Sequence, residues 1–408
     1  MASVLHDRRL RRRSDLHRRD RGGHGLPLGA VRAIDLASTR TDSEPLDVLV
    51  IGAGQAGLVM GYELKQRGLD FAIVDAGPEV GDSWRKRWTS LKLFTAAQYN
   101  HLPGKQFSAS VDTYPGKDEV ADFLRDYADE LELPVRLNTK VTGLTRGAGG
   151  YVAETSSGTI TAKQVVVATG PFQEPFVPAM ASELDRSVTQ LHSVEYRDPN
   201  TLPEGRVLVV GGANTGCQIA LELAASHDVD IAVGERLPTL PQRPLGRDIW
   251  WWLTKLGITR VTAQSRLGRR MSERDVVIGG GLKELKRHGV TVRPRAAGAS
   301  NRSIRFDDDS TAQYDVVIWA TGFGVDHSWI DVPDLKGESG SVKHVRGVTS
   351  SPGLYLLGMT WQHKRTSALL GWVADDAAFL AERITSTIGS PVPAEAAAER
   401  VQRTGGTR

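Results

Sequence analysis

The chain alternates short runs of consecutive apolar residues with longer stretches in which apolar residues recur every three or four positions. Apolar runs of four or five residues are typical of parallel strands buried on both faces, and the longer recurrence is typical of amphipathic helices. We therefore expect buried strands at 48–51, 71–74, 164–168, 229–234, 314–319 and 354–357, and another beginning at 207. We expect a helix ending near 67, helices at 118–132, 248–256, 281–288 and 367–384, a strand at 135–142 and a hairpin at 151–161.

The stretch DVLVIGAGQAGLVMGYELKQRGLDFAIVDA, residues 47–76, joins two of these strands through a glycine turn and a helix. Its GAGQAG matches the dinucleotide fingerprint G-x-G-x-x-G. Gly52 allows the tight turn, Gly54 lets the backbone approach a pyrophosphate, and Gly57 lets the helix pack close to the strand. The helix N-terminus offers N–H groups and a partial positive charge to phosphate. Asp75, at the end of the next strand, is placed to accept hydrogen bonds from a ribose and disfavours a 2′-phosphate, so FAD or NAD fits this turn.

A similar unit returns at 206–224 as RVLVVGGANTGCQIALELA, but Ala213 stands where the second glycine of the fingerprint belongs. Gly211 and Gly216 retain the turn and the close helix contact. Asn214 and Thr215 could donate side-chain hydrogen bonds to a phosphate at the helix start. The sequence therefore predicts a second dinucleotide site with a modified phosphate loop.

The end of the following strand indicates which dinucleotide this is. Glu235 and Arg236 follow the strand, and Arg243 and Arg247 come soon after. Arginine suits bidentate recognition of a 2′-phosphate, which favours NADPH. Glu235 could bind a ribose hydroxyl, which leaves NADH open.

Two dinucleotide turns in one chain imply two dinucleotides, and we expect hydride transfer from NADPH to a resident FAD. The fold class we predict is α/β, with two Rossmann-like, three-layer domains of which the NADPH domain is inserted into the FAD domain. The limits we expect are a disordered basic tail at 1–45, an FAD domain at 46–171 and 316–390, an NADPH domain at 172–315, and a flexible tail at 391–408.

Composition changes this picture little. Residues 1–46 hold ten Arg and six acidic residues, a net +4, whereas the whole chain carries +3, so the remainder is near neutral and indicates no nucleic-acid groove. The single cysteine, Cys217, excludes an intrachain disulfide and is expected to be a packing residue. We find no membrane span, no signal peptide and no metal-ligand set. We expect a cytoplasmic enzyme that acts on a small molecule, with a homodimer left open. The reduced flavin could pass its electrons to an external acceptor or to molecular oxygen, since a single cysteine excludes a disulfide acceptor within the chain.

The chain resembles the flavin-containing monooxygenase family, especially its bacterial and plant YUCCA-like branch. The resemblance covers about residues 46–388 and rests on the two glycine turns, the GDSWR segment at 81–85, the two A-T-G turns at 168–170 and 320–322, and the segment GLYLLGMTWQHKRTSALLGWVADDAAFLAERI. It implies that reduced FAD reacts with oxygen to form a C4a-(hydro)peroxyflavin, which oxygenates a nucleophilic nitrogen or sulfur or a carbonyl carbon.

The resemblance and the fingerprints together give the expected site residues. For FAD these are Gly52, Gly54, Gln55, Ala56, Gly57, Asp75, Trp84, Arg85, Val141, Ala168, Thr169, Gly170, Thr321, Gly322 and Gly358. For NADPH they are Gly211, Gly212, Asn214, Thr215, Gly216, Arg236 and Arg243. Weak candidates for a catalytic role are His192, Tyr196 and Asn100.

Two departures from the family pattern concern the oxygen chemistry. The family signature F-x-G-x-x-x-H-x-x-x-(F/Y) keeps only His192 and Tyr196, with Arg186 and Val188 at the Phe and Gly positions. Where other members carry an oxygen-site Asn, this chain reads Leu-Phe-Thr at 93–95, and the nearest Asn is Asn100. Two alternatives therefore stay open: an NADPH-dependent flavin oxidoreductase or oxidase without oxygen insertion, and a non-catalytic nucleotide-binding redox sensor.

Three further groups have two interpretations each. The rings at 250–252 cannot share one helix face, so we expect part of them in the core and part at a pocket rim, a subunit contact or solvent. The cations at 363–365 are either a solvated turn or neighbours of the flavin. Asp375 and Asp376 are expected to solvate or cap the last helix, and contact with the flavin is the alternative.

Overall fold

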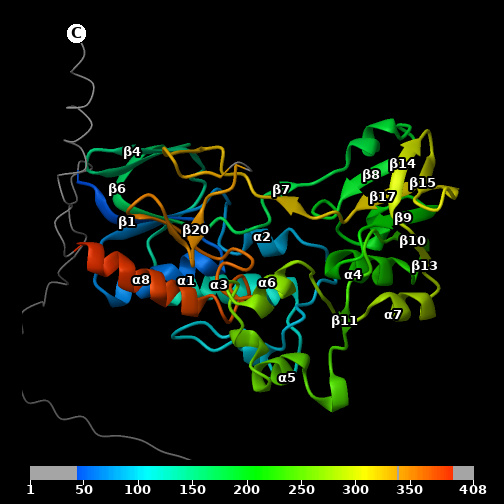
Figure 1. The fold of residues 1–408 in the computed structure, drawn as a ribbon, viewed down its shortest axis with the longest axis horizontal. Coiled ribbons are helices and arrows are strands. Elements are labelled where there is room, and N and C mark those ends of the chain that lie inside the picture. Colours follow the sequence, from blue (N-terminus) through cyan, green and yellow to red (C-terminus); the bar gives the residue numbers. More distant parts are fainter. Residues whose placement is uncertain (1–43, 338–339, 389–408) are drawn as a thin grey trace, which may run out of the picture. The chain divides into compact units, whose positions relative to one another are not determined.

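A computed structural model describes residues 44–337 and 340–388. The two tails expected at 1–45 and 391–408 therefore lie almost entirely outside the described residues. The structure is mixed α/β and built on two separate sheets, each with a parallel core, joined by two crossing segments (Figure 1). The fold class predicted from the apolar pattern is confirmed.

The first sheet carries the first glycine turn. Its parallel core has the order β3-β2-β1-β6-β22, and β6 continues into an antiparallel meander with β5 and β4. The short β19, β20 and β21 extend its edges. The bounds are β1 Leu46–Ile51, β2 Phe71–Val74, β3 Val135–Arg136, β4 Val141–Gly147, β5 Gly150–Thr155, β6 Gly158–Val167, β19 Ile330–Asp331, β20 His344–Val345, β21 Val348–Thr349 and β22 Leu354–Leu356.

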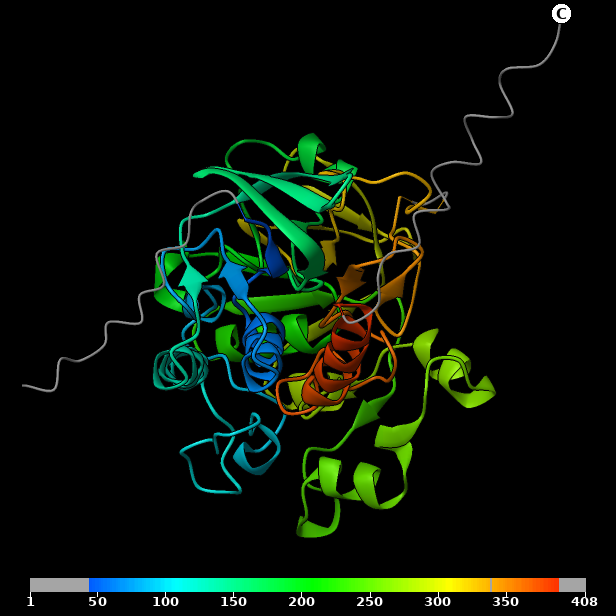
Figure 2. The same ribbon diagram turned by 90° about the vertical axis from the view of Figure 1, so that its left-hand side faces the viewer.

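Side chains of β1 alternate between two cores because successive strand residues point to opposite faces. Val48 and Val50 pack against the helices α1 (Gln55–Gln66), α3 (Lys117–Glu130) and α8 (Ala374–Ile388) on one face. Leu49 and Ile51 pack against the meander on the other face. Figure 2 shows the helices beneath the sheet and the meander above it, which is the expected three-layer arrangement.

The second sheet carries the second glycine turn and is wholly parallel, in the order β13-β10-β9-β17-β8. Its helices α4 and α7 cover one face, and a small antiparallel sheet, β14-β15-β16, covers the other. The bounds are β8 Thr189–His192, β9 Arg206–Val210, α4 Asn214–Leu223, β10 Asp228–Ala232, α7 Leu282–Arg287, β13 Thr291–Arg293, β14 Ala296–Ser300, β15 Ser303–Phe306, β16 Thr311–Gln313 and β17 Val316–Trp319.

Strand β17 corrects the domain limit expected at 315/316. It pairs with β9 and β8, so it belongs to the second sheet and not to the first. The chain crosses between the sheets at β7 (Glu174–Pro175) and again at β18 (Phe323–Gly324), which pair antiparallel. A buried parallel strand reads the same in either sheet, because only its hydrogen-bonded neighbours assign it to one of them.

Between β11 (Thr239–Leu240) and β12 (Val277–Ile278), which pair in parallel, the chain leaves the second sheet. We call residues 241–276 the arm. The arm holds the short helices α5 (Ile249–Lys255) and α6 (Arg266–Ser272), with 3₁₀ turns at Pro244–Gly246 and Ile258–Arg260. The helix expected at 248–256 is confirmed in α5.

The last helix begins later than expected. Residues 359–373 form turns, and α8 starts only at Ala374, so the start predicted at 367 is wrong. The turns come directly after Gly358 and pack over the start of α1, where Gln55 donates to the carbonyl oxygen of Ala368 at 3.3 Å. None of the helices within 44–337 and 340–388 is long and apolar enough to cross a bilayer.

Candidate functional site: two dinucleotide turns

The first glycine turn has the backbone that its residue types demand. Gly52 has φ +110°, and a Cβ there would lie 2.6 Å from the carbonyl oxygen of Ala168. A Cβ on Gly57 would lie 1.8 Å from the carbonyl oxygen of Gly52. At Gly54, by contrast, a Cβ would meet nothing within 4 Å. The turn is therefore closed on the protein side and open where Gly54 precedes the N-terminus of α1, the shape that a pyrophosphate requires.

Asp75 closes this turn through its side chain. The backbone N–H of Ala53 donates to Asp75 Oδ2 at 2.6 Å, and that of Gly77 donates to Oδ1 at 2.7 Å. A carboxylate oxygen has two acceptor positions, so the half-buried Asp75 keeps acceptor capacity toward a ribose. Val141, also expected here, starts β4 and packs into the core beside β1 and β2.

Segments from distant parts of the chain surround the same turn. Ala168 donates to the carbonyl oxygen of Ile51 at 2.8 Å, which places the 168–170 turn beside Gly52. A Cβ on Gly358 would come within 2.7 Å of the methyl group of Ala56. The structure therefore brings 52–57, 75, 168–170 and 358 together at the carboxyl ends of parallel strands.

Trp84 and Arg85 lie on the short helix α2 (Asp82–Arg85). Trp84 is half-buried against the first core. Arg85 forms ion pairs with Glu79 at 2.9 Å and with Asp122 of α3 at 2.7 Å. The hydrogen bond to Asp122 is the main cause that raises the pKa of Arg85. The guanidinium thus anchors α2 to α3.

The second glycine turn repeats the first with one methyl group added. Ala213 caps α4 with φ −84° and ψ −177°, and Gly54 caps α1 with φ −75° and ψ −176°. An extended conformation of this kind accepts any residue, so Ala213 introduces no backbone strain. Gly211 and Gly216 remain necessary, because their Cβ atoms would lie 2.2 Å from Ala320 O and 1.9 Å from Gly211 O. The substitution alters the approach to the helix N-terminus and leaves the turn intact.

The other residues at this turn have structural partners. Gly212 faces Val233, whose Cγ1 would be 2.9 Å from an added Cβ. Asn214 does not point to a phosphate as expected: its Nδ2 donates to Val276 O at 3.3 Å, and its Oδ1 accepts from Ile278 N at 2.9 Å. Asn214 therefore fixes the returning end of the arm against α4. Thr215, next to it, stays half-buried in the first turn of α4.

Thr321 and Gly322 were expected at the FAD turn, and the structure places them at the second turn. They follow β17, whose last residue leads into Ala320, and Ala320 N donates to Val210 O at 2.8 Å. Phe176 N donates to Gly322 O at 3.0 Å, which ties this turn to the crossing segment after β7. The two A-T-G turns look equivalent in sequence, but each one lies beside the glycine turn of its own sheet.

The end of β10, where the sequence predicted contacts to the 2′-phosphate, has more arginines nearby than the sequence indicated. Arg236 is exposed after β10, as expected. Glu235 forms an ion pair with Arg274 at 3.1 Å, so its charge is compensated. The guanidinium carbon of Arg295 would lie 2.9 Å from a Cβ on Gly234, which places this side chain over the end of β10. Arg295 was missed because it follows β13, and only the β10–β13 pairing brings the two together.

Arg243 lies elsewhere. Its Nε donates to the Tyr114 hydroxyl at 3.0 Å, its NH2 donates to Asp112 O, and the guanidinium stacks over the Tyr114 ring at 5.2 Å. Arg243 therefore links the arm to Asp112 and Tyr114, in the segment before α3. Its expected place in the NADPH site is not supported.

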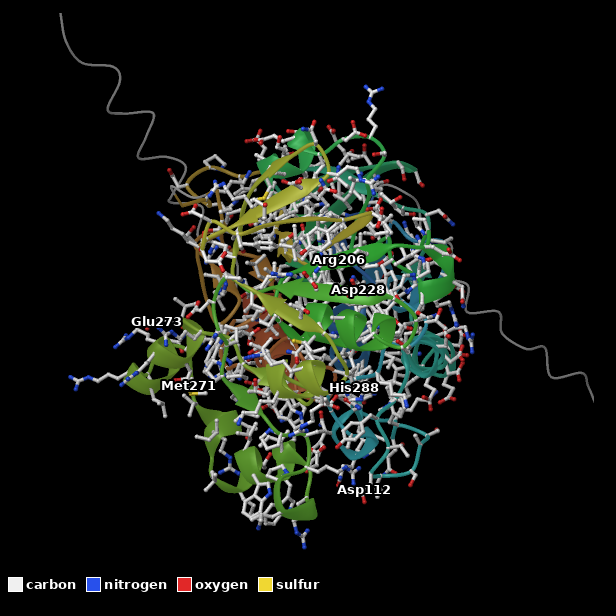
Figure 3. The ribbon with its side chains drawn as sticks, turned by 90° about the vertical axis from the view of Figure 1, so that its right-hand side faces the viewer. Asp112, Arg206, Asp228, Met271, Glu273 and His288 are labelled. Atoms are coloured by element: carbon white, nitrogen blue, oxygen red, sulfur yellow. The ribbon has the colours of Figure 1, made fainter. Side chains whose placement is uncertain are left out.

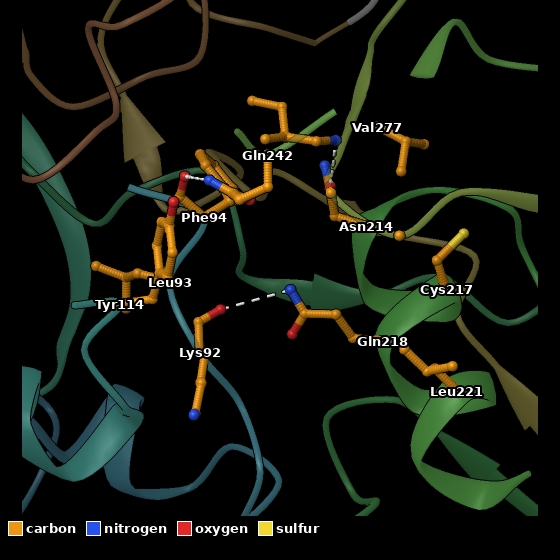
Figure 4. A pocket seen from close by; sticks show the side chains of 13 residues that line it. Lys92, Leu93, Phe94, Tyr114, Asn214, Cys217, Gln218, Leu221, Gln242 and Val277 are labelled. Atoms are coloured by element: carbon orange, nitrogen blue, oxygen red, sulfur yellow. Dashed lines mark hydrogen bonds between the residues drawn. The ribbon is translucent and has the colours of Figure 1, made fainter. Parts of the chain in front are cut away.

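A cavity of about 180 Å³ opens between α4 and the segment 92–94 (Figure 4). Gln218 of α4 spans it and donates to Lys92 O at 3.4 Å. Gln242 of the arm donates to Phe94 O at 2.9 Å. The lining is mainly apolar with amide, phenol and amine groups at its rim: Lys92, Leu93, Phe94, Tyr114, Asn214, Cys217, Gln218, Leu221, Gln242, Val277, Ile278, Gly279 and Gly280. The sequence had shown no motif for this cavity, because its lining comes from five separate stretches of the chain.

The single cysteine is a packing residue, as expected. Cys217 lies on the buried face of α4, and burial raises the pKa of its thiol to about 11. A thiol held protonated in this way is a poor nucleophile.

Two of the weak catalytic candidates are structural. Asn100 is fully buried, and its amide donates to Thr95 O at 3.0 Å and to Ala96 O at 3.2 Å. Tyr196 is fully buried and donates its hydroxyl to Glu222 of α4 at 2.9 Å. Burial and this hydrogen bond raise the pKa of Tyr196.

The third candidate, His192, lies at the crossing between the two sheets. It is buried, and its Nε2 contacts Gly322 O at 3.0 Å while Val194 N donates to Nδ1 at 3.2 Å. This pairing places the ring proton on Nε2. Its ring packs edge-to-face on Phe323 at 4.9 Å, and the guanidinium of Arg87 lies over the same Phe323 ring at 5.4 Å. Burial lowers the pKa of His192, so the ring is neutral near pH 7.

The three tryptophans divide as the helix geometry required. Trp250 is buried and stacks with Phe94 at 6.1 Å and with Trp372 at 5.1 Å. Trp251 and Trp252 are only half-buried on the outer side of α5. The aromatic cluster around Trp250 joins the arm, the segment 94–99 and the turns before α8 into one apolar contact.

Comparison with known proteins gives consistent results. The profile of the pyridine nucleotide-disulphide oxidoreductase family matches residues 49–255. A CzcO-like uncharacterized oxidoreductase of Geobacillus kaustophilus is 45% identical over 337 residues, 82% of this chain and 97% of that protein. Rice indole-3-pyruvate monooxygenase YUCCA4 is 28% identical over 67% of this chain and 73% of its own length. A flavin-containing monooxygenase from Stenotrophomonas maltophilia superposes with TM-score 0.72 at 28% identity, over 85% of this chain and 99% of that one.

Proposed function

The chain belongs to the flavin-containing monooxygenase family, within the pyridine nucleotide-disulphide oxidoreductases, and we propose that it is an NADPH-consuming, FAD-dependent monooxygenase of a small nucleophilic or carbonyl substrate. One observation carries this proposal. Two glycine turns of the same backbone geometry lie in one chain, and each precedes a helix N-terminus at the carboxyl edge of its own parallel sheet.

We assign FAD to the first turn and NADPH to the second. The open space at Gly54 and the remaining acceptor capacity of Asp75 fit a dinucleotide without a 2′-phosphate. The guanidinium groups of Arg236 and Arg295 fit the 2′-phosphate of NADPH. The FAD domain then comprises the first sheet with α1, α3 and α8, and the NADPH domain comprises the second sheet and the arm.

When bound, FAD supplies hydride acceptance and reaction with oxygen, which no side chain can provide. The residues of the chain bind, orient and exclude water. The aromatic cluster of Phe94, Trp250 and Trp372 excludes water where the arm packs on the segment 94–99 and on the turns before α8. Neutral His192 positions the crossing segment through Gly322. Exclusion of water limits the loss of activated oxygen as peroxide.

The competing function is an NADPH oxidase that inserts no oxygen atom. One observation favours it: the amide of Asn100 is used entirely within the 95–100 turn, so this chain has no counterpart there to an oxygen-site asparagine. The two functions differ in where the oxygen atoms go.

The test is oxygen accounting with ¹⁸O₂. The purified chain with FAD is supplied with NADPH and a thioether, a tertiary amine or a ketone, and the product is examined by mass spectrometry. We expect ¹⁸O in one product and peroxide below the NADPH consumed. Peroxide equal to NADPH with every substrate would establish the oxidase instead. If NADPH fails to bleach the flavin under anaerobic conditions, the redox-sensor alternative replaces both.

Coenzyme selection gives a separate prediction. We expect Arg295→Ala and Arg236→Ala each to raise KM for NADPH by about tenfold, because each removes a charge-assisted contact to the 2′-phosphate, and to change KM for NADH by less than about twofold. The matched control is Arg305→Ala, which removes an exposed arginine of β15 in the same domain. Equal changes for both coenzymes would remove Arg295 from this role.

A further inference from the structure

The arm presents an unusual combination of exposed apolar and cationic side chains. Leu245, Leu256 and Leu267 are 89%, 70% and 51% exposed. Trp251 and Trp252 lie half-exposed between the first two. Single exposed leucines are ordinary on protein surfaces, but three on one short excursion with two tryptophans form a group.

Cations accompany these apolar residues. Residues 241–276 contain eight Arg and Lys and three acidic residues. Two of the acidic residues are already engaged: Asp248 is buried and accepts from the Tyr114 hydroxyl at 2.7 Å, and Asp275 pairs with Arg365 outside the arm at 2.7 Å. Arg274 also pairs outside the arm, with Glu235 at 3.1 Å, so the arm keeps the excess of cations that its composition gives. Figure 3 shows long basic side chains extending from the part of the arm that carries Met271 and Glu273.

The tip of the arm is held in a conformation that presents a leucine to solvent. Leu245 has φ +53° and ψ +35°, the left-handed region that side chains other than glycine rarely adopt. The turn is fixed by Trp252, whose Nε1 donates to Pro244 O at 3.0 Å, and by Arg247, whose N–H donates to the same oxygen at 3.2 Å. These two hydrogen bonds hold the turn in a conformation that leaves Leu245 89% exposed.

Tryptophan 251 has the environment of an interfacial residue. Arg247 lies over its ring at 4.8 Å and Lys255 at 5.9 Å. Segments that lie in the headgroup region of a bilayer combine Arg and Lys with Trp and Leu. In such segments the rings and leucines insert among the lipids, and the cations contact lipid phosphates. A nucleic acid would use the cations and leave the leucines in water.

We propose that the arm is a peripheral docking surface for an anionic lipid bilayer. Leu245, Leu256 and the outer face of α5 insert at the level of the headgroups, and Arg266, Arg269 and Arg270 of α6 contact lipid phosphates. The base of the arm lines the cavity through Gln242 and packs on Phe94, so a docked arm would bring this cavity close to apolar molecules dissolved in the membrane.

The test is co-sedimentation of the full chain with phosphatidylcholine vesicles that either contain or lack phosphatidylserine. We expect binding at least about tenfold stronger with phosphatidylserine, and weaker at high salt. Leu245→Ser/Leu256→Ser should weaken it about tenfold or more through lost insertion. Arg269→Glu/Arg270→Glu should weaken it about tenfold or more through charge.

Matched controls separate the arm from other exposed apolar and cationic residues of the described chain. Val345→Ser removes an equally exposed apolar residue from the first sheet, and Lys283→Glu/Arg287→Glu reverses two exposed cations of α7. Each control should change binding by less than about twofold. NADPH oxidation without vesicles should be unchanged in all variants, which shows that they fold.

Three outcomes overturn the proposal. The first is that the wild-type chain does not bind phosphatidylserine vesicles. The second is that both arm variants bind these vesicles as strongly as the wild type. If the leucine variant instead lowers the molar mass in light scattering, the arm is an interface between copies of this chain.

Discussion

Gly57→Ala is expected to yield a chain that is at least about 3 kcal/mol less stable and retains no flavin. The added methyl would lie 1.8 Å from the carbonyl oxygen of Gly52, and both atoms belong to main-chain positions that a rotamer change cannot move. The start of α1 would have to leave β1, which disrupts the first core and the phosphate turn together. Flavin absorbance after purification and the urea midpoint measure the two effects.

Gly54→Ala is the matched control in the same glycine turn. A Cβ at Gly54 meets nothing within 4 Å, and its φ of −75° suits alanine. The variant should fold as the wild type and bind FAD more weakly, since its methyl group occupies the space above the helix N-terminus. If Gly54→Ala unfolds while Gly57→Ala keeps its flavin, the proposed geometry of the first turn is wrong.

Asp230→Ala is expected to lower the free energy of unfolding by about 3–5 kcal/mol. The side chain of Asp230 has no exposed surface. Its carboxylate accepts hydrogen bonds from Arg206 at 3.0 Å, from Arg293 at 2.7 Å and from the Tyr314 hydroxyl at 2.6 Å. Removing the carboxylate leaves two partly buried guanidinium groups and a buried hydroxyl without their acceptor. Chemical denaturation followed by circular dichroism gives the change.

Asp228→Ala is the control for charge alone. It removes a carboxylate of the same strand, β10, that is 70% exposed and lies 3.4 Å from Arg206 of β9. Its loss should change stability by less than about 1 kcal/mol. Equal losses for both variants would show that burial of Asp230 contributes nothing beyond an ordinary surface ion pair. Because β10 adjoins the second glycine turn, Asp230→Ala should also weaken NADPH binding.

The two glycine turns show how far local sequence could be followed. The residues of each turn adopt the expected backbone: Gly52 and Gly211 have φ +110° and +124°, and their helices begin where the fingerprint predicts. The positive φ of the first glycine and the close contact of the third glycine with the first are local requirements, and glycine spacing records them directly. The approach of Ala168 to Gly52 and of Ala320 to Gly211 depends on strand pairing. The apolar runs of β1 and β9 likewise predicted buried parallel strands correctly.

Predictions that needed the neighbours of a strand failed in a consistent way. β17 was assigned to the first domain, and Thr321 and Gly322 with it, although β17 pairs with β9 and β8. Arg295 was overlooked because it becomes a neighbour of Gly234 only when β13 pairs with β10. Arg243 was assigned to NADPH by its distance along the chain, yet it stacks on Tyr114.

The sequence by itself determined the fold class, both dinucleotide turns and the packing role of Cys217, since these follow from apolar periodicity, glycine sterics and residue counts. Only the tertiary structure decided which sheet receives β17, which cations reach the end of β10, and that the arm and the segment 92–94 enclose a cavity. Those features join residues far apart in the chain, and hydrogen bonding between strands and packing between lobes, not local preference, bring them together.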